Sequence, residues 1–296
     1  MREEIRKIQA LMEGAAYITD PAISTAVHLG MTLGKPLLVE GHAGVGKTEI
    51  AKVLAQVLGT NLIRLQCYEG LDASTALYEW NYPKQLLHIK LEESTDHSLA
   101  QKEAAIFSEP FLIRRPLLQA ITQSDQPPVL LIDEIDRSDE EFEAFLLEVL
   151  SDFQVTIPEI GTIKATHTPY VILTSNRNRE LSDALRRRCL YQWADFPGFE
   201  KEVRIVTRKV PGINDRLARE ISRFMETLRT LRLAKVPGVA ETLDWAQALS
   251  ALHADHLDEE LVSETLGCIL KDADDVRRFR RDLAASGLKR FVPAEG

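Results

Sequence analysis

The sequence has little cysteine and no apolar run long enough to cross a membrane. Its three cysteines, Cys67, Cys189 and Cys268, are far apart and form no C-x-x-C pair, which disfavours a disulfide framework or a zinc site and favours buried free thiols. No apolar run approaches the roughly 18 residues of a spanning helix, and residues 1–5 contain acids that a signal peptide lacks. We therefore expect a globular cytoplasmic protein without a transmembrane segment, with peripheral membrane association left open.

An excess of basic charge is also missing. The net charge is −9, and the segment from Phe199 onward carries 17 basic and 17 acidic residues, so the whole net charge lies before it. A chain that binds nucleic acid usually carries the opposite sign. No nucleic-acid partner is expected, although a local basic pore could exist in an acidic protein.

What the sequence does contain is the segment GHAGVGKT, residues 41–48, directly after the apolar stretch 36–40. It fits the phosphate-loop pattern G-x-x-x-x-G-K-[ST], in which backbone N–H groups and the next helix bind a polyphosphate. Lys47 can reach the β and γ phosphates, and the Thr48 hydroxyl can hold Mg²⁺. The candidate nucleotide-binding residues are His42, Ala43, Gly44, Val45, Gly46, Lys47, Thr48 and Glu49.

A second motif is the run VLLIDE, residues 129–134, in which four apolar residues lead into two acids. Such a run predicts a strand buried on both faces, with its acids at the carboxyl edge of a parallel sheet where ligands bind. Asp133 is then expected to hold the Mg²⁺ shell and Glu134 to deprotonate the attacking water. The alternative is that both acids only cap a helix that begins near Ser138.

These two motifs favour ATP hydrolysis over other nucleotide chemistry. An Asp followed by a Glu supplies a base for water, which transfer to a bound acceptor does not need. The guanine-specific pattern Asn-Lys-x-Asp is missing, and the D-x-x-G match at residues 195–198 is better explained as a strand exit and turn. The expected cofactors are ATP and Mg²⁺.

Strand and helix patterns alternate through the first two thirds of the chain, which predicts an α/β fold with a five-stranded parallel sheet. The expected strands are 37–39, 61–66, 129–133, 170–175 and 190–193, with a helix at 46–58. Residues 67–128 are too long for a simple connection and predict an insertion. Two β-branched runs within 154–166, joined by Pro158–Gly161, predict a β-hairpin.

After Phe196-Pro-Gly198 the pattern becomes helical, with expected helices at 200–210, 214–231, 242–253, 258–270 and 272–285. Pro-Gly pairs at 211–212 and 237–238 separate some of these helices. We therefore expect two domains, an α/β nucleotide-binding core with N-terminal helices at 1–197 and a small helical lid at 198–296.

Two further positions are candidates for chemistry. Asn176 follows the strand 170–175, so its amide can reach the attacking water or the γ phosphate, although an Asn at a strand end is often only a turn former. The three arginines 186–188 end a short helix. One of them could neutralise transition-state charge in a neighbouring subunit, as an arginine finger does; the alternative is a solvated basic turn.

The order of these elements, from the phosphate loop through Asp133-Glu134 and Asn176 to the arginines and a helical lid, resembles the AAA+ ATPases. The insertion after the second strand, together with the hairpin before Asn176, resembles the MoxR branch of that family. The segments 65–82 and 173–189 are similar to the CoxD-type members, which are associated with maturation of molybdenum- and copper-containing carbon monoxide dehydrogenase.

The resemblance implies a ring-forming homo-oligomer, a hexamer in the family, that remodels a client protein for metal-centre assembly. It also implies a partner with a von Willebrand A-type fold. Position by position, Asn176 matches the first sensor, Arg188 the finger and Arg187 its second choice. The open alternatives are an activase of the rubisco or nitric oxide reductase type and a nucleotide-switched binding module.

Two features depart from the pattern or stay ambiguous. The lid of such ATPases usually carries a second sensor arginine, yet residues 239–245 contain none, so an arginine from another lid helix could substitute. Tyr78, Trp80 and Tyr82 recur at every second position in the insertion. They could either grip a client or form the core of the insertion.

Overall fold

The computed structural model describes residues 2–92 and 98–292. The chain divides into two compact units. Unit 1 comprises Met1–Gln9, Pro21–Glu40 and Thr48–Trp193, and unit 2 comprises Ala10–Asp20, Gly41–Lys47 and Ala194–Gly296. Residues 293–296 of the predicted lid and residue 1 of the predicted core lie outside the described residues. In the described part of the chain, no helix has both the length and the apolar character to cross a membrane.

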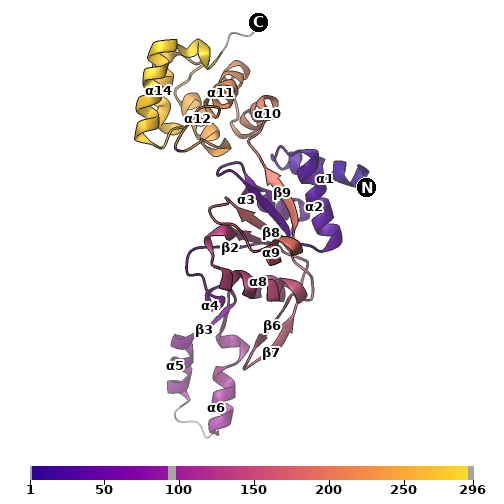
Figure 1. Cartoon of the computed structure of the whole chain (residues 1–296). Helices are drawn as coiled ribbons and strands as arrows, with labels where there is room; N and C mark the ends of the chain where they lie inside the picture. The colour runs from indigo at the N-terminus through magenta and orange to yellow at the C-terminus, as the bar shows by residue number, and fades with distance from the viewer. Residues whose placement is uncertain (1, 93–97, 293–296) are drawn as a thin grey trace. The chain divides into compact units, whose positions relative to one another are not determined.

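A five-stranded parallel sheet forms the centre of the α/β core (Figure 1). Its order is β2 (Leu62–Gln66), β5 (Val129–Asp133), β8 (Tyr170–Ser175), β1 (Leu37–Gly41) and β9 (Leu190–Ala194). The register pairs Gln66 with Asp133, Ile132 with Leu173 and Leu38 with Leu173. Every residue of β1 and of β5 is buried, because helices cover a parallel sheet on both faces. The predicted fold class and the five predicted strands are confirmed.

Helices precede the first strand and connect the later ones, as the alternating pattern predicts. They are α1 (Arg2–Gly14), α2 (Pro21–Leu33), α3 (Lys47–Leu58), α7 (Pro116–Thr122), α8 (Glu140–Asp152) and α9 (Asp183–Arg188), with a short 3-10 helix η2 (Ile135–Arg137) after β5. Phe142 and Leu146 of α8 pack in one apolar core with Leu130 and Ile132 of β5. The Asp139 side chain accepts a hydrogen bond from the Phe142 N–H and so caps α8.

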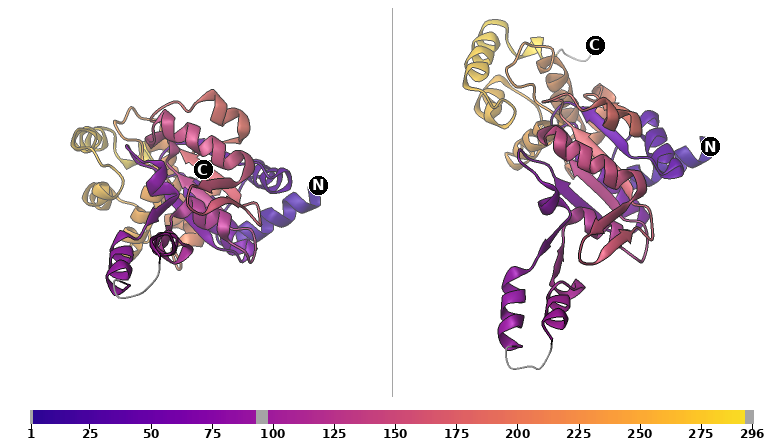
Figure 2. Two further views of the ribbon diagram at one scale, coloured as in Figure 1. Left: turned by 90° about the horizontal axis from the view of Figure 1, so that it is seen from below. Right: turned by 60° about the horizontal axis from the view of Figure 1, so that its bottom comes forward.

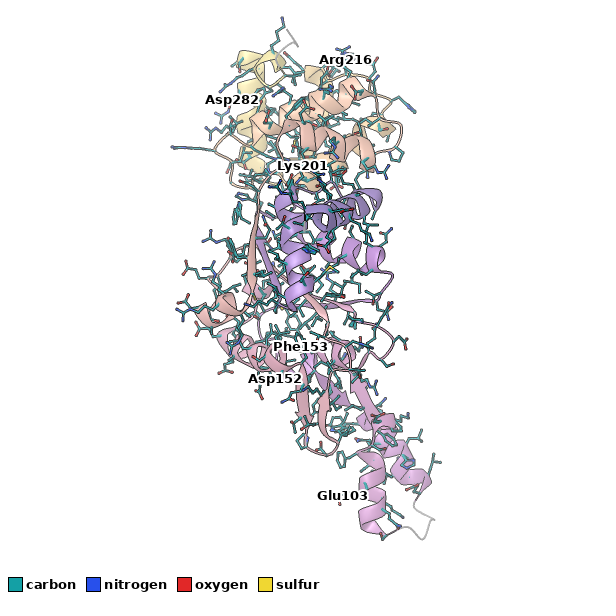
Figure 3. All side chains as sticks on the ribbon, turned by 90° about the vertical axis from the view of Figure 1, so that its right-hand side faces the viewer. Glu103, Asp152, Phe153, Lys201, Arg216 and Asp282 are labelled. Carbon is teal, nitrogen blue, oxygen red and sulfur yellow. The ribbon has the colours of Figure 1, made fainter. Side chains whose placement is uncertain are left out.

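The predicted hairpin is present between α8 and β8. Its strands β6 (Gln154–Ile157) and β7 (Gly161–Lys164) are antiparallel. Asp152 ends α8, and Phe153 adopts a left-handed φ of 47° that turns the chain into β6 (Figure 3). Gly161, at φ 102°, closes the turn at a conformation that only glycine adopts without strain.

The insertion consists of a two-stranded ribbon that carries two helices. The ribbon pairs β3 (Tyr78–Trp80) with β4 (Leu112–Arg114), and it is flanked by α4 (Ala73–Ala76), α5 (Tyr82–Leu91), α6 (Leu99–Ile106) and η1 (Glu109–Phe111). Within unit 1, α5 and α6 lie side by side beyond the ribbon, away from the five-stranded sheet (Figures 1 and 2).

The aromatic residues of the insertion do not act as one set. Trp80 is 7% exposed and packs edge-on against Phe107 and Tyr78, so it belongs to the core of the insertion. Tyr82, by contrast, is 60% exposed at the start of α5. The structure therefore favours packing for Trp80, and only Tyr82 of the three presents a large exposed surface.

Unit 2 contains the helical C-terminal region. Its helices are α10 (Phe199–Lys209), α11 (Asp215–Leu228), α12 (Val239–Ala251), α13 (Glu259–Thr265) and α14 (Ala273–Ser286), followed by η4 (Leu288–Arg290). Phe224, Trp245, Phe279 and Phe291 form its aromatic core. The helix predicted at 242–253 begins earlier, at Val239, because Glu241 caps the Gly238 N–H. The helix predicted at 258–270 ends at Thr265, where η3 (Leu266–Cys268) follows.

Candidate functional site

The carboxylate of Asp133 lies at the carboxyl end of β5 and is 2% exposed. Its Oδ1 accepts hydrogen bonds from the hydroxyls of Thr48, at 3.0 Å, and Thr174, at 2.5 Å. Thr48 belongs to α3 and Thr174 to β8, so neighbouring elements converge on one carboxylate. The structure thus brings the two predicted metal-binding residues, Thr48 and Asp133, into direct contact.

Glu134 is held in place by its backbone conformation and by four side chains. It adopts a left-handed conformation, φ 56° and ψ 49°, which is uncommon for a residue with a side chain and typical of functional sites. Its N–H donates to the Thr174 hydroxyl. Its carboxylate accepts from Gln66 Nε2 at 3.1 Å and from Asn176 Nδ2 at 3.5 Å, and pairs with Arg137 Nε at 3.1 Å. The predicted pair Glu134 and Asn176 is therefore adjacent.

Two residues of β2 that the sequence analysis did not single out contact Asp133 and Glu134, the pair that we call the acidic cluster. Arg64 donates from Nε and Nη2 to Asp133 Oδ2, at 3.1 and 2.5 Å, and its Nη2 also lies 2.5 Å from Gln66 Oε1. Arg64 and Gln66 are two positions apart and so share one face of the strand. The spacing of Arg64 and Gln66 was visible in the sequence. Their contacts with Asp133 and Glu134, however, follow from the pairing of β2 with β5, which the sequence did not reveal.

The acidic cluster also affects the nearby thiol of Cys67. Burial, together with the charges of Asp133, Asp136 and Glu134, raises the pKa of Cys67 to about 12. Burial likewise raises the pKa of Cys189 to about 12. Both cysteines are free thiols, and at neutral pH both are protonated and unreactive.

A second buried acid, Glu40, lies at the end of β1. Its carboxylate, 1% exposed, accepts from Arg186 Nη2 at 3.0 Å and from the Ser175 hydroxyl at 3.3 Å, and Arg177 Nε lies 3.9 Å away. Arg186 is therefore engaged within its own subunit. The neighbouring arginines of α9, Arg187 and Arg188, are exposed.

The loop between Asn176 and α9 is fixed by a buried acid of α8. Glu143, 1% exposed, pairs with Arg179 and accepts from the Ser182 N–H at 2.9 Å. The Ser182 side chain in turn caps α9 through the Leu185 N–H. This network links the position of Asn176 to that of the arginines.

The phosphate-loop segment Gly41–Lys47 belongs to unit 2, and Thr48 begins the next segment of unit 1. Lys47 Nζ donates to the carbonyls of Gly41 and His42, at 2.8 and 2.6 Å. Gly44 and Gly46 have φ values of 73° and 90°, which only glycine adopts without strain. The glycines of the motif are therefore required by the loop conformation itself.

Within unit 2, the start of α12 packs directly on this loop. The Ala240 N–H donates to the Gly44 carbonyl at 3.1 Å. A Cβ at Gly238 would lie 2.6 Å from the Ala43 carbonyl oxygen, so no larger residue fits there without movement. A Cβ at Gly44 would lie 3.1 Å from a Glu241 carboxylate oxygen. The segment 239–245, where the resemblance led us to look for an arginine, thus places the acid Glu241 next to the loop.

The remaining candidates of the loop have other contacts. His42 stacks on Phe196 with ring centroids 4.4 Å apart, and its Nε2 lies 3.8 Å from Asp195. Glu49, in unit 1, pairs with Lys52. Val45 contributes to the loop between Gly44 and Gly46.

The helical region contains Arg229, whose side chain is 7% exposed. It makes a two-pronged pair with Glu202, at 2.6 and 2.7 Å, and donates to the Thr242 hydroxyl and to the carbonyls of Pro237 and Gly238. Because it holds the segment that begins α12, Arg229 supports the α12 contact with the phosphate loop. The sequence left open that an arginine of another helix substitutes for the second sensor, but Arg229 is neutralised by Glu202 and so does not offer a free positive charge.

The sequence matches the ATPase family associated with various cellular activities (AAA) over residues 37–193, more than half of its 296 residues. The chain belongs to this family of ATPases. The matched range begins with β1 and ends within β9, and it includes the phosphate loop and the acidic cluster.

Solved structures with a similar fold include the Holliday junction branch migration motor RuvB of Thermotoga maritima. It is 18% identical, with a TM-score of 0.48, over 98% of this chain and 77% of that chain. A point mutant of the same protein is 20% identical, with a TM-score of 0.49, over 83% of this chain and 67% of that chain. No curated protein matches the sequence.

Proposed function

We propose that this AAA-family ATPase hydrolyses Mg²⁺-bound ATP, with the phosphate-loop motif binding the nucleotide and the acidic cluster supplying the catalytic base. The observation that carries the proposal is the convergence of Thr48, Asp133, Glu134 and Asn176 at the carboxyl edge of β5 and β8. The Thr48 hydroxyl and the Asp133 carboxylate offer the oxygen donors that Mg²⁺ prefers. When bound there, Mg²⁺ would supply positive charge that partly neutralises the phosphates.

In this proposal each residue has one task. The loop residues 42–47 bind the phosphates with backbone N–H groups, and the Lys47 ammonium turns from its carbonyl partners to the phosphates. Glu134 takes the proton of the attacking water, while Asn176 orients Glu134 and that water. The buried and hydrogen-bonded state of Asp133 keeps its oxygens fixed toward the site.

The position of the arginines favours a site shared between subunits. Asn176 directly follows β8, at the carboxyl edge of the sheet, whereas the Leu190 N–H bonds to the carbonyl of Pro36, just before β1. The chain after Arg188 therefore enters the sheet at its amino edge, whereas Arg186 of the same helix reaches Glu40 near the carboxyl end of β1. Arg187 and Arg188 are exposed beside this engaged arginine, so Arg188, or Arg187 as second choice, would serve a neighbouring copy in a ring, a hexamer by family resemblance.

A client-remodelling role is supported by the exposed apolar face of α5. Tyr82, Leu86, Leu87 and Leu91 are 59–69% exposed on this one helix. Its exposed residues also include Lys84 and Lys90 but no acid, so the face suits an apolar, acidic segment of a client protein. Because α5 is carried on the ribbon away from the sheet, a client can contact it without blocking the acidic cluster.

The finer assignment rests on the sequence resemblance. We infer membership in the MoxR branch, closest to CoxD-type ATPases, with a carbon monoxide dehydrogenase as client, a von Willebrand A-type partner and a cytoplasmic location. The division into a core at 1–197 and a lid at 198–296 is part of the same proposal. An activase of the rubisco or nitric oxide reductase type and a nucleotide-switched binding module are the alternatives.

Mixing two inactive variants tests the shared site. Lys47→Ala disables the phosphate loop and Arg188→Ala the finger, so a mixed ring contains interfaces with both elements intact and regains ATP turnover. Mixing Lys47→Ala with Glu134→Gln is the matched control, because both lesions fall on the same side of the interface and no site is complete. Turnover is followed by phosphate release across mixing ratios. Equal activity of the two mixtures would refute the shared site.

A further inference from the structure

The carboxylate that the proposed function assigns to the Mg²⁺ shell is bound by a cation of the same chain. Arg64 donates two N–H groups to Asp133 Oδ2, while Thr48 and Thr174 donate to Oδ1. A carboxylate has about four lone-pair positions. Nearly all of the hydrogen-bonding capacity of Asp133 is therefore used by side chains of the chain itself.

Arg64 is suited to leave this contact. Its side chain is 50% exposed, whereas that of Asp133 is 3% exposed. The buried carboxylate cannot follow the arginine into water, but the guanidinium can move to solvent while its strand stays in place. The exchange of one cation for another at Asp133 thus requires only a side-chain rotation on β2.

Arg64 also contacts the partner of the catalytic acid. Its Nη2 donates to Gln66 Oε1 at 2.5 Å, and Gln66 Nε2 donates to Glu134 Oε2 at 3.1 Å. One arginine therefore touches Asp133 directly and Glu134 through a single amide. Its displacement would remove a partner of Gln66 at the same time as it frees Asp133.

We propose that Arg64 competes with the divalent metal for Asp133 and so sets the metal concentration at which the nucleotide site fills. A guanidinium at hydrogen-bond distance from a metal-binding carboxylate repels a divalent cation and occupies the acceptor oxygens of that carboxylate. Arg64 is a positioning residue in this scheme, since it acts through Asp133. The inference rests on the proposed ATP site.

The test measures metal binding rather than turnover. Full-length protein, saturated with a non-hydrolysable ATP analogue, is titrated with Mn²⁺ and the free ion is followed by electron paramagnetic resonance. Arg64→Met, which keeps the apolar stem but not the charge, should lower the Mn²⁺ dissociation constant roughly three- to tenfold, because it removes charge-assisted hydrogen bonds to Asp133 that half exposure of Arg64 already weakens. Arg64→Lys keeps the charge but not the two-pronged guanidinium, so its Mn²⁺ dissociation constant should lie between those of the native protein and Arg64→Met.

Arg114→Met is the matched control, since it removes a half-exposed arginine from an ion pair with Glu109 in the insertion. It should leave the Mn²⁺ affinity unchanged. In a protein that already carries Asp133→Asn, Arg64→Met should no longer increase the Mn²⁺ affinity, because the carboxylate for which Arg64 and the metal compete is absent. Thermal unfolding of each variant checks that it is folded.

Three outcomes would overturn the inference. Unchanged Mn²⁺ affinity in a folded Arg64→Met variant would show that Arg64 does not compete. If Arg64→Met bound the ATP analogue more weakly in excess chelator and did not bind Mn²⁺ more tightly, Arg64 would contact the phosphates rather than compete with the metal. Failure of the native protein to bind the analogue at all would overturn the proposed function together with this inference, whereas the first two results leave that function intact.

Discussion

Removal of Arg229 should unfold the helical region at much lower denaturant. Arg229 and Glu202 are 7% and 0% exposed, and the guanidinium also lies over the Phe196 ring with its central carbon 4.8 Å from the centroid. Arg229→Met would leave the Glu202 carboxylate buried without a counter-charge, which costs about 3–5 kcal/mol. With a urea slope of about 2 kcal/mol/M, the unfolding midpoint should fall by about 1.5–2.5 M.

Fluorescence of Trp245, which is fully buried in this region, reports the transition once Trp80 and Trp193 are replaced by Phe in all chains compared. Arg277→Met is the matched control, because its pair with Asp274 is 70% and 86% exposed and should contribute under about 1 kcal/mol. The double variant Glu202→Gln with Arg229→Met should recover at least half of the fall in unfolding midpoint seen for Arg229→Met, since this pair then leaves no buried charge. A midpoint shift in Arg229→Met no larger than that of the control would refute the reasoning.

Three other outcomes are expected. Leu87→Ser with Leu91→Ser should abolish stimulation of ATP turnover by a client while basal turnover stays unchanged; equal stimulation would remove α5 from client binding. Because the folded thiols of Cys67 and Cys189 have pKa values of about 12 against about 8.5 unfolded, the stability they confer is complete below about pH 8.5 and declines above it. Replacing both by Ala should flatten the fall in unfolding free energy between pH 9 and 10 by up to about 2.7 kcal/mol, measured with urea. Glu241→Gln should tighten ATP binding a few-fold in a fluorescent-nucleotide titration, and no change would show that its charge is not felt at the loop.

Local patterns predicted the parts of the fold that local chemistry determines. The apolar runs 129–133 and 170–175 became β5 and β8 because strands buried on both faces need uninterrupted apolar residues. The turn at Pro158–Gly161 predicted the hairpin because Gly161 accepts a left-handed conformation. Such signals lie within a few residues of each other and need no knowledge of the sheet order.

Contacts across the sheet could not be predicted in the same way. Arg64 and Asp133 are 69 positions apart, and Arg186 and Glu40 are 146 apart, so their pairing follows from the order β2, β5, β8, β1, β9. The motif identified Asp133 but not the cation that binds it. Likewise, the three consecutive arginines gave no sign that Arg186 binds within its own subunit while Arg187 and Arg188 are exposed.

The acid at Glu241 changes where the positive charge for catalysis can come from. Its carboxylate accepts from the Gly238 N–H and lies beside Gly44, so the start of α12 brings a negative charge to the phosphate loop. The nearby lid arginine, Arg229, is neutralised by Glu202. If triphosphate binds as proposed, Lys47 is then the main cation that the loop itself supplies, and an arginine of a neighbouring subunit would add the positive charge that hydrolysis needs. On this reasoning an isolated protomer would bind ATP and hydrolyse it slowly, and assembly would switch on the chemistry.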